Sequence, residues 1–330
     1  MRIGLIDVDS HNFPSLPLMK ISAYHKSRGD QVEWCVPLCH YDIVYVSKTF
    51  GDEYTQMDMT VINADKILYG GTGFAIEVKD GKEVYVKEDD PVLPDEIEHI
   101  YPDYSLYPDL TKDTAYGFLT RGCPNNCAFC LVSKKEGRIT RKVADLNEWW
   151  NGQKKIVLLD ANILACRDHL ELLEQLAASG AWVDFCQGLD ARFITPQNLE
   201  VLNRIKIKTI HFAFDFMKNE KRIIAGLNMA AQQLNLAAMN AAVYMLTNYD
   251  TTIEQDLYRL REIQKTGLIP DVRIYRKTSL PRRHILRDLQ RWCNNRFIYR
   301  SSSFFDYVPR KDGLPIRELY KEQLKNCDEV

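Results

Sequence analysis

The sequence predicts an α/β protein built from two parallel sheets in succession. Apolar stretches of five to seven residues alternate along the chain with longer segments whose apolar residues recur at helical spacing. Such alternation favours parallel sheets, because each helix carries the chain back to the start of the next strand. The pattern is interrupted once, by residues 87–112, and resumes in longer units.

Composition sets limits on the class of protein. The chain has 330 residues, of which 45% are hydrophobic and 27% charged, as in ordinary soluble domains. Its net charge of -2 gives no overall attraction to nucleic acid or to a membrane surface. The start, MRIGLIDVDSH, lacks the pattern of a signal peptide, and no apolar stretch approaches the roughly 20 residues of a membrane helix. We therefore expect a cytoplasmic protein without a membrane partner.

The N-terminal part is predicted to form a small doubly wound parallel sheet. A helix is expected over residues 17–29, with Gly29 at its end. Residues 78–86 suggest a hairpin with Asp80 and Gly81 at its turn. The expected strands are residues 2–8, 31–36, 42–47 and 66–71.

Residues 87–112 are acidic, rich in proline and tyrosine, and without a clear period, which is typical of a linker between domains. We place the boundary near residue 105. The predicted division is thus an N-terminal domain (1–105), a second domain (106–280) and a C-terminal extension (281–330).

The second domain is predicted to be a partial (βα)₆ barrel, in which functional side chains gather at the carboxyl ends of the strands. Each expected strand except the last is followed by a helical stretch; one such stretch starts after Thr195 and another, with a capping box of Thr251 and Glu254, spans 252–267. The expected strands are residues 116–121, 155–160, 182–187, 209–214, 243–247 and 271–276.

Three of the nine cysteines crowd into RGCPNNCAFCLV, where Cys123, Cys127 and Cys130 have the spacing C-x-x-x-C-x-x-C. In a reducing cytoplasm this crowding favours a metal site over a disulfide. Three thiolates can hold a four-iron cluster and leave one iron open, and the loop follows the first strand of the predicted barrel. The alternative, a structural zinc site, needs a fourth ligand, and residues 110–166 contain no His and only Cys166 besides the three.

This spacing, with Phe129 before the last cysteine, resembles the signature of the radical S-adenosylmethionine (SAM) superfamily. The resemblance implies a [4Fe–4S] cluster held by Cys123, Cys127 and Cys130, with SAM bound to the open iron. It further implies that one electron, from an external flavodoxin- or ferredoxin-like donor, cleaves SAM to a 5′-deoxyadenosyl radical that attacks an unidentified substrate.

The same resemblance assigns SAM contacts to polar residues at the ends of the predicted strands. Asp160 and Asn162 stand where relatives grip the methionine amino group, although the common Gly-Gly-Glu is absent here. Each of these residues has an alternative role as a helix cap or a solvated turn, and Thr251 is best read as a cap. The implied further contacts are Gln187 (with Asp190 and Arg192 nearby), Asp215 near the ribose, Asn248 near the adenine, and Tyr275 beside Ile274.

One branch of this superfamily carries a Rossmann-like, cobalamin-binding domain before the barrel, and DSHNFP resembles its D-x-H-x-x-G motif, with Pro14 in place of the glycine. His11, Ser47, Gly70 and Gly71 are therefore candidate contacts for cobalamin or substrate, or plain loop and turn residues. Loss of cobalamin is common in that branch. Methylthiotransferases of tRNA need three cysteines in this domain, whereas only Cys35 and Cys39 are present.

Residues 273–311 contain eleven lysines and arginines, two acidic residues and seven aromatic ones. Such a mixture can bind a phosphate backbone and stack bases, which leaves a nucleotide or nucleic acid open as substrate. One alternative is a helix with one apolar face and one solvated basic face, and another is that these arginines meet an anionic small substrate or the acidic linker. The function we predict is that of a radical SAM enzyme. The alternatives are a cobalamin-dependent radical methyltransferase and, from other classes, an iron–sulfur electron carrier or nucleic-acid-binding protein.

Overall fold

The computed structural model is a mixed α/β protein with parallel sheets, as predicted. Contacts group the chain into two compact units, one of residues 1–160 and 179–181 and one of residues 161–178 and 182–330. The residues that the structure describes are 1–55, 57, 62–79, 82–235, 241–310 and 313–329.

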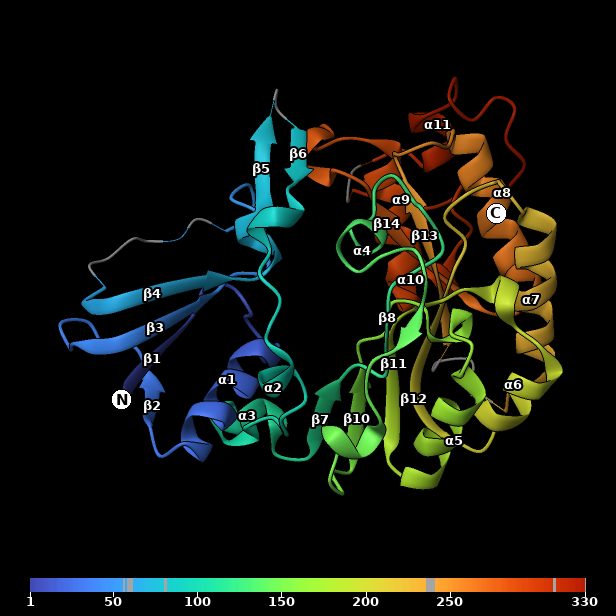
Figure 1. The fold of residues 1–330 in the computed structure, drawn as a ribbon. Coiled ribbons are helices and arrows are strands. Elements are labelled where there is room, and N and C mark those ends of the chain that lie inside the picture. The colour runs from blue at the N-terminus through green and yellow to red at the C-terminus, as the bar shows by residue number, and fades with distance from the viewer. Residues whose placement is uncertain (56, 58–61, 80–81, 236–240, 311–312, 330) are drawn as a thin grey trace. The chain divides into compact units, whose positions relative to one another are not determined.

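The smaller sheet, in the first unit, has four parallel strands in the order β2-β1-β3-β4 (Figure 1). All four predicted strands are confirmed. Helix α1 (Leu16–Ser27) also confirms its prediction, and Gly29 follows it with φ +80°, a backbone conformation that suits glycine. The strands are β1 (Arg2–Asp7), β2 (Gln31–Trp34), β3 (Tyr41–Ser47) and β4 (Ala64–Gly70).

Both faces of the smaller sheet are covered. On one face Leu18 and Ile21 of α1 pack against Ile3 and Leu5 of β1. On the other face a cluster around the buried Val44 packs against partly buried side chains of neighbouring strands and loops. The described residues place one long helix, α1, against this sheet, whereas a doubly wound sheet has helices on both faces. The doubly wound arrangement therefore stays a prediction.

Strands β5 (Ile76–Lys79) and β6 (Lys82–Tyr85) form the predicted antiparallel hairpin, whose expected turn residues, Asp80 and Gly81, lie outside the described residues. The segment 87–112, expected to be a linker, contains two short helices, α2 (Asp95–Glu98) and α3 (Pro108–Thr111).

This segment packs within the first unit. Ile97 of α2 joins the core beneath α1, and the Tyr107 hydroxyl donates to Asp7 Oδ2 at 2.6 Å. The first compact unit extends to residue 160 and includes residues 179–181. The three-part division of the sequence stays a prediction.

The larger sheet has six parallel strands in the order β14-β13-β12-β11-β10-β7. One predicted strand, residues 116–121, is wrong in extent: β7 ends at Gly117, and β8 (Thr120–Arg121) pairs instead with β9 (Arg141–Lys142) in an antiparallel ladder. The parallel strands are β7 (Thr114–Gly117), β10 (Lys155–Leu158), β11 (Trp182–Leu189), β12 (Lys206–Ala213), β13 (Ala241–Thr247) and β14 (Ile269–Ile274).

Helices follow these strands, and in the second unit α7 and α8 lie side by side (Figure 1). Two details of the prediction are wrong. The last strand is also followed by a helix, α9, and the capping box of α8 is formed by Thr252 and Gln255 rather than Thr251 and Glu254. The helices are α4 (Val132–Lys135), α5 (His169–Ser179), α6 (Pro196–Leu202), α7 (Glu220–Gln233), α8 (Ile253–Lys265), α9 (Ile285–Asn294), α10 (Arg296–Ser301) and α11 (Ile316–Leu319).

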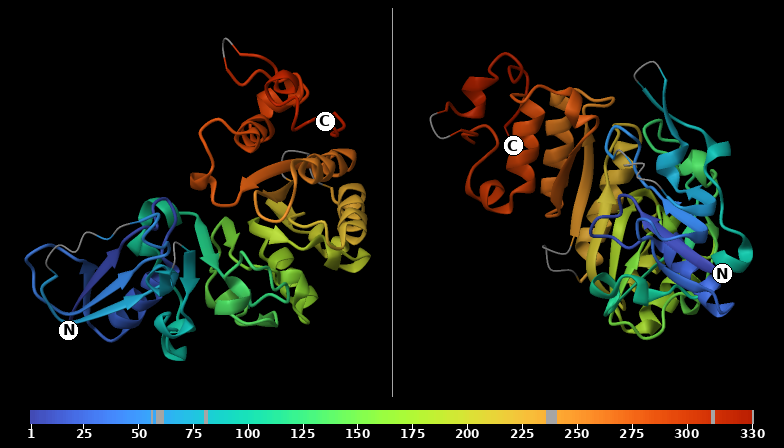
Figure 2. Two further views of the ribbon diagram at one scale, coloured as in Figure 1. Left: turned by 90° about the horizontal axis from the view of Figure 1, so that it is seen from above. Right: turned by 90° about the vertical axis from the view of Figure 1, so that its left-hand side faces the viewer.

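Helix α9 covers the β14 edge of the larger sheet, where the C-terminal segment lies in both views of Figure 2. The amide of Asn294 imitates a neighbouring strand: its Oδ1 accepts from Val272 N–H at 2.8 Å and its Nδ2 donates to Val272 O at 3.0 Å. Gln290 Nε2 donates to the same carbonyl at 2.9 Å. Side chains thus satisfy backbone groups of an edge strand that would otherwise invite another chain to pair.

Candidate functional site

The three cysteines of the motif lie on one loop, residues 122–140, between β8 and β9. Pairing of these two strands closes the base of the loop. Just inside the base, Cys123 N–H donates to Gly137 O at 3.1 Å, and Thr140 Oγ1 donates to Gly122 O at 3.1 Å. The first cysteine is therefore held by backbone contacts that do not depend on a bound metal.

Gly122 lets the chain turn from β8 into this loop. Its φ is +91°, and a Cβ at this position would lie 2.3 Å from Ile139 O. No L-residue with a side chain fits there without moving the opposite arm of the loop. The glycine before the first cysteine is therefore required by the loop itself.

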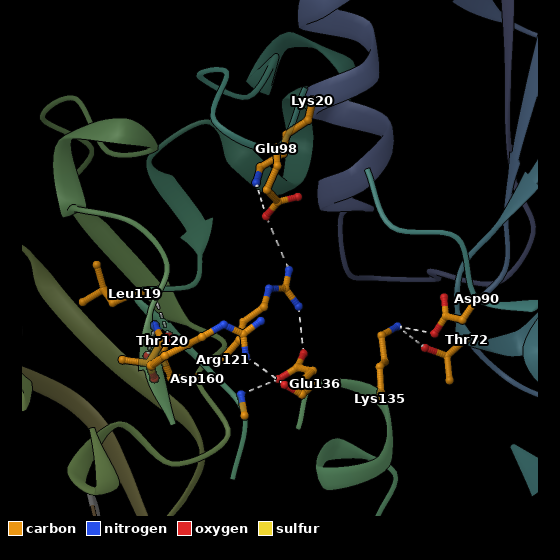
Figure 3. A network of polar contacts seen from close by, with 12 residues as sticks. Lys20, Thr72, Asp90, Glu98, Leu119, Thr120, Arg121, Lys135, Glu136 and Asp160 are labelled. Carbon is orange, nitrogen blue, oxygen red and sulfur yellow. Dashed lines mark hydrogen bonds and ion pairs between the residues drawn. The ribbon is translucent and has the colours of Figure 1, made fainter. Parts of the chain in front are cut away.

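Glu136 joins the two arms of the cysteine loop (Figure 3). Its Oε1 accepts from Arg121 Nη1 at 2.8 Å, its Oε2 accepts from Gly122 N–H at 3.0 Å, and its carbonyl accepts from Arg141 Nη1 at 2.8 Å. Hydrogen bonds to charged groups are about twice as strong as neutral ones. A single glutamate thus fixes both ends of the loop.

The same arginine connects the loop to α1 through a chain of alternating charges. Arg121 Nη2 lies 3.7 Å from Glu98 Oε1, which accepts from Lys20 Nζ of α1 at 2.9 Å (Figure 3). Burial lowers the pKa of Lys20, and Glu98 opposes that effect. Lys20 is buried, whereas Glu98, Arg121 and Glu136 are partly exposed, and the four side chains form one chain of ion pairs from α1 to the cysteine loop.

A second ion pair ties the cysteine loop to the end of the smaller sheet. Lys135 of α4 donates from Nζ to Asp90 Oδ2 at 2.8 Å and to Thr72 Oγ1 at 2.6 Å (Figure 3). Thr72 directly follows Gly70 and Gly71, two of the predicted contact residues. The first unit therefore brings this glycine turn and the cysteine loop into one set of contacts.

The three thiols lie in partly exposed positions. Cys123, Cys127 and Cys130 are each of intermediate exposure, and Cys130 N–H donates to Cys127 O at 3.0 Å, which bends the chain between them. Among the described residues, no group of three or more His, Cys, Asp or Glu side chains is arranged to hold a metal ion. Each thiolate of a four-iron cluster binds a different iron. The described residues therefore give no support to the alternative of a single zinc ion, whose ligands must converge on one point.

Asp160, predicted to grip SAM, has a clear structural task. Its side chain follows β10, is 4% exposed, and accepts from Leu119 N–H at 2.8 Å, from Thr120 N–H at 2.6 Å and from the Thr120 hydroxyl. These donors fix the break between β7 and β8, directly before the cysteine loop. Burial raises the pKa of Asp160 to about 7, against the effect of the three donors. A SAM contact for this residue stays a prediction.

The other predicted SAM contacts belong to the second unit. Asn162 is buried at the start of a short turn, Ile163–Ala165. Gln187 is exposed and lies in an irregularity of β11, between Phe185 and Gly188, where the register with β12 shifts. Such bulges often redirect a side chain beside a functional site. Asp190, at the end of the same strand, is engaged by Arg192, whose Nε donates to Asp190 Oδ1 at 2.8 Å.

Asn248 and Tyr275 are brought together at neighbouring strand ends. Asn248 has φ +62°, and its Nδ2 donates to Tyr275 O at 2.8 Å. The Tyr275 ring stands edge-on to Tyr249, with 5.0 Å between centroids. Asp215, after β12, accepts from Leu246 N–H at 2.9 Å, and burial raises its pKa. These residues share the end of the sheet that the sequence indicated, and their roles toward SAM stay predictions.

Arg259 holds these strand ends in place, and sequence reasoning missed it. Its side chain is fully buried in α8, and its guanidinium donates to Phe214 O at 2.6 Å and to Leu246 O at 2.7 Å. It also pairs with Asp256 Oδ1 at 2.5 Å. The two carbonyls precede Asp215 and Asn248 by one and two residues, so this arginine positions both.

The candidate cobalamin contacts are engaged in local structure. The Ser47 hydroxyl is buried and bonds to Ser15 Oγ at 3.1 Å. Gly71 has φ +99°, and a Cβ there would lie 2.3 Å from Lys48 O, so a backbone turn explains this glycine. His11 is exposed with φ +46°. The contacts of Ser47 and Gly71 are explained by local packing and turn geometry, and they do not form a binding site for a corrin ring.

Sequence reasoning also missed Glu136, Arg121 and Lys135. Nothing in the local sequence distinguishes them, because their partners lie on other segments. In comparisons with known proteins, no family model matches the chain, and no curated protein matches it significantly. In the described residues, no helix is long and apolar enough to cross a membrane.

Proposed function

We propose that this chain is a radical SAM enzyme. The observation that carries the proposal is a single loop with three partly exposed cysteines in the spacing C-x-x-x-C-x-x-C, which comes after β7 of the parallel sheet and the short strand β8. The larger sheet is then interpreted as the partial (βα)₆ barrel of that superfamily and the smaller one as its Rossmann-like N-terminal domain.

Cys123, Cys127 and Cys130 would hold the cluster. The donor set fits, since three soft thiolates from one loop suit iron–sulfur ligation and leave one iron for a cosubstrate. When bound, the cluster and SAM would supply reductive cleavage of the sulfonium, which starts radical chemistry on the substrate.

The chain itself would supply position and shielding. Glu136 and Arg121 fix both arms of the cysteine loop, and Asp160 fixes the strand break before it. In the second unit Asn248, Tyr275 and Asp215 offer an amide, an aromatic ring and a carboxyl group at strand ends. We assign them to cosubstrate binding, with Arg259 as their positioning residue. The electron would come from an external one-electron donor.

The test is anaerobic reconstitution with iron and sulfide, followed by dithionite and SAM. We expect about four irons per chain, the absorbance of a reduced cluster on treatment with dithionite, and formation of 5′-deoxyadenosine. The variant Cys123→Ala/Cys127→Ala/Cys130→Ala should lose all three signals. The matched control is Cys39→Ala/Cys186→Ala/Cys327→Ala, which removes three partly exposed thiols outside the loop and should keep them.

Two outcomes would refute the proposal. One is a fully loaded cluster that yields no 5′-deoxyadenosine or methylated product with SAM, which would favour an electron carrier. The other is a loop variant that retains as much iron as the control. Cobalamin-dependent methyl transfer lacks a supporting observation, because Ser47 and Gly71 are explained by local packing.

A further inference from the structure

A cavity of about 910 Å³ lies in the second unit, between the turn after β14 and the helices α9 and α10. Its volume is at the upper end of the ~300–1,000 Å³ range of ligand sites. None of the residues assigned above to the cluster or to SAM lines this cavity. Its lining residues are Lys277, Arg282, Arg287, Asp288, Gln290, Arg291, Asn294, Asn295, Arg296 and Phe297.

The lining carries five cationic groups and one acidic one. Asp288, the acid, is engaged, since its Oδ2 accepts from the Tyr320 hydroxyl at 2.7 Å. In the described part of the chain, Lys277, Arg282, Arg287 and Arg291 take part in no ion pair. Among the described residues, the charge of these four groups is therefore not neutralised by an ion pair. Such a field attracts a polyanion.

Contacts within the lining hold part of this charge in place. Arg287 Nη2 donates to Lys277 O at 2.6 Å and to Leu280 O at 3.0 Å, and Lys277 Nζ donates to Gln290 Oε1 at 2.6 Å. Arg282 and Arg291 are exposed and make no such bonds among the described residues. The site thus combines a fixed wall with two exposed arginines.

The opposite face of α9 is anchored in the core. Leu289 and Trp292 are buried, and Trp292 Nε1 donates to Ser302 O at 3.0 Å. Since the apolar face is fixed, the basic face cannot rotate inward. Helix α9 is therefore the amphipathic helix of the second interpretation, and its polar face lines a basic cavity.

The lining of this cavity includes one exposed aromatic side chain, that of Phe297. Phe297, in the first turn of α10, is 90% exposed, although it lines the same cavity. An exposed phenylalanine ring among arginines offers a platform on which a nucleobase can stack. A small phosphorylated metabolite would need neither this ring nor five cationic groups.

We propose that this cavity binds single-stranded nucleic acid, with the arginines on successive phosphates and Phe297 against a base. The inference stands on the cavity, its charge and the exposed ring, and it does not rest on the proposed radical chemistry. Either can fail without the other.

The test uses the full chain and fluorescein-labelled single strands, oligo-uridine and oligo-thymidine of about 12 nucleotides, a length within the site sizes of such proteins. Binding is followed by fluorescence anisotropy between 50 and 200 mM salt, the range over which counterion release is resolved. Arg282→Ala/Arg291→Ala should weaken binding about tenfold or more and reduce the salt slope by about 1 to 2.

The matched control is Arg283→Ala/Arg300→Ala, which removes the same charge from exposed arginines outside the cavity. It should change affinity about twofold or less. Phe297→Ala should weaken binding by about fivefold to a hundredfold, the range for loss of one base stack. Circular dichroism should show all of these variants folded, since every altered side chain is exposed.

Three outcomes would overturn the inference. The first is equal weakening by the cavity and control pairs, which would mean general attraction to the surface. The second is tight binding that neither cavity variant affects. The third is an inert Phe297→Ala together with displacement of the oligonucleotide by inorganic polyphosphate at equal phosphate concentration, which would leave a general anion site.

Discussion

Glu136 accepts a hydrogen bond from Arg121 Nη1 at 2.8 Å, although Arg121 lies in β8, directly before the cysteine loop, and Glu136 lies toward the other end of that loop. The second oxygen of the same carboxylate accepts from Gly122 N–H, the residue directly before the first cysteine. The loop is therefore closed by protein contacts at the point where its ligands begin. A preformed loop pays less ordering entropy when a metal group binds.

Glu136→Ala should reduce cluster loading. It removes two hydrogen bonds to charged or loop-forming groups, each worth about 1.5–3 kcal/mol where a charge takes part. We expect iron retained after anaerobic reconstitution and gel filtration to fall by half or more. Lys134→Ala, an exposed change on α4, is the control and should retain the wild-type iron content. Equal iron in both variants would show that the loop does not depend on this carboxylate.

Asp160 predicts a pH dependence of stability. Its pKa is raised by burial from 3.8 to about 7, so the folded protein binds a proton more tightly than the unfolded chain. The unfolding free energy should therefore be highest below about pH 4 and fall as pH rises toward 7. Three pKa units correspond to on the order of 4 kcal/mol. Stability falls with rising pH because burial of Asp160 in the folded protein favours its neutral, protonated form.

Urea unfolding followed by tryptophan fluorescence between pH 4 and pH 8 checks this sign. Asp160→Asn should lower the unfolding free energy at low pH, because an amide cannot reproduce all three contacts with Leu119 and Thr120. The same variant should also flatten the decrease of the unfolding free energy with rising pH, because an amide does not titrate. Asp109→Asn, an exposed change in the same unit, should leave the decline in place. A stability that rises through this window in the wild type and not in Asp160→Asn would reverse the assignment.

The parallel strands could be predicted from the sequence, since these are short apolar runs bounded by turn residues. The extent of the strand predicted at residues 116–121 could not, because the sequence there has the pattern of one continuous strand. There Asp160, distant in sequence, accepts from Leu119 and Thr120 and breaks the run after Gly117. A contact made by another segment decided the local structure, and no periodicity in the run itself carries that information.

Gly117→Ala should destabilise the first unit. A Cβ at this position would lie 2.3 Å from Trp149 Cδ2, and the ring cannot easily move, since its Nε1 donates to Phe118 O at 3.1 Å. Overpacking of this kind costs about 1–3 kcal/mol, and loss of the tryptophan hydrogen bond adds about 1 kcal/mol. The melting temperature should fall by several degrees.

Gly70→Ala is the matched control, because a Cβ there meets only Pro91 Cγ at 3.7 Å, an ordinary contact. It should melt within a degree or two of the wild type. Since Gly70 was a candidate ligand contact, the same variant also shows whether that glycine is needed by the fold. If Gly70→Ala proved the more damaging change, the packing argument would be wrong.

For the site, the sequence indicated the cysteines and the strand-end residues, because spacing and position in the alternating pattern are local properties. It missed the groups that hold them. Glu136, Arg121 and Arg259 are charged residues in ordinary surroundings, and their importance arises from partners brought near by the fold. Arg259 in particular lies in α8 among other charged residues, and nothing in that helix distinguishes a buried arginine from an exposed one.

Arg259→Met should be the most destabilising of these changes. The buried guanidinium satisfies Phe214 O and Leu246 O and neutralises Asp256, so its removal leaves two carbonyls and one carboxylate buried without their partner. Breaking a buried pair in this way costs about 3–5 kcal/mol.

Arg261→Met, on the same helix, breaks only a surface pair with the exposed Asp328 and should cost about 1 kcal/mol or less. The comparison is made by thermal unfolding of both variants beside the wild type. The double variant Arg259→Met/Asp256→Leu should recover part of the loss, because it removes the stranded carboxylate. If Arg259→Met and Arg261→Met melted alike, Arg259 would not be holding the ends of β12 and β13.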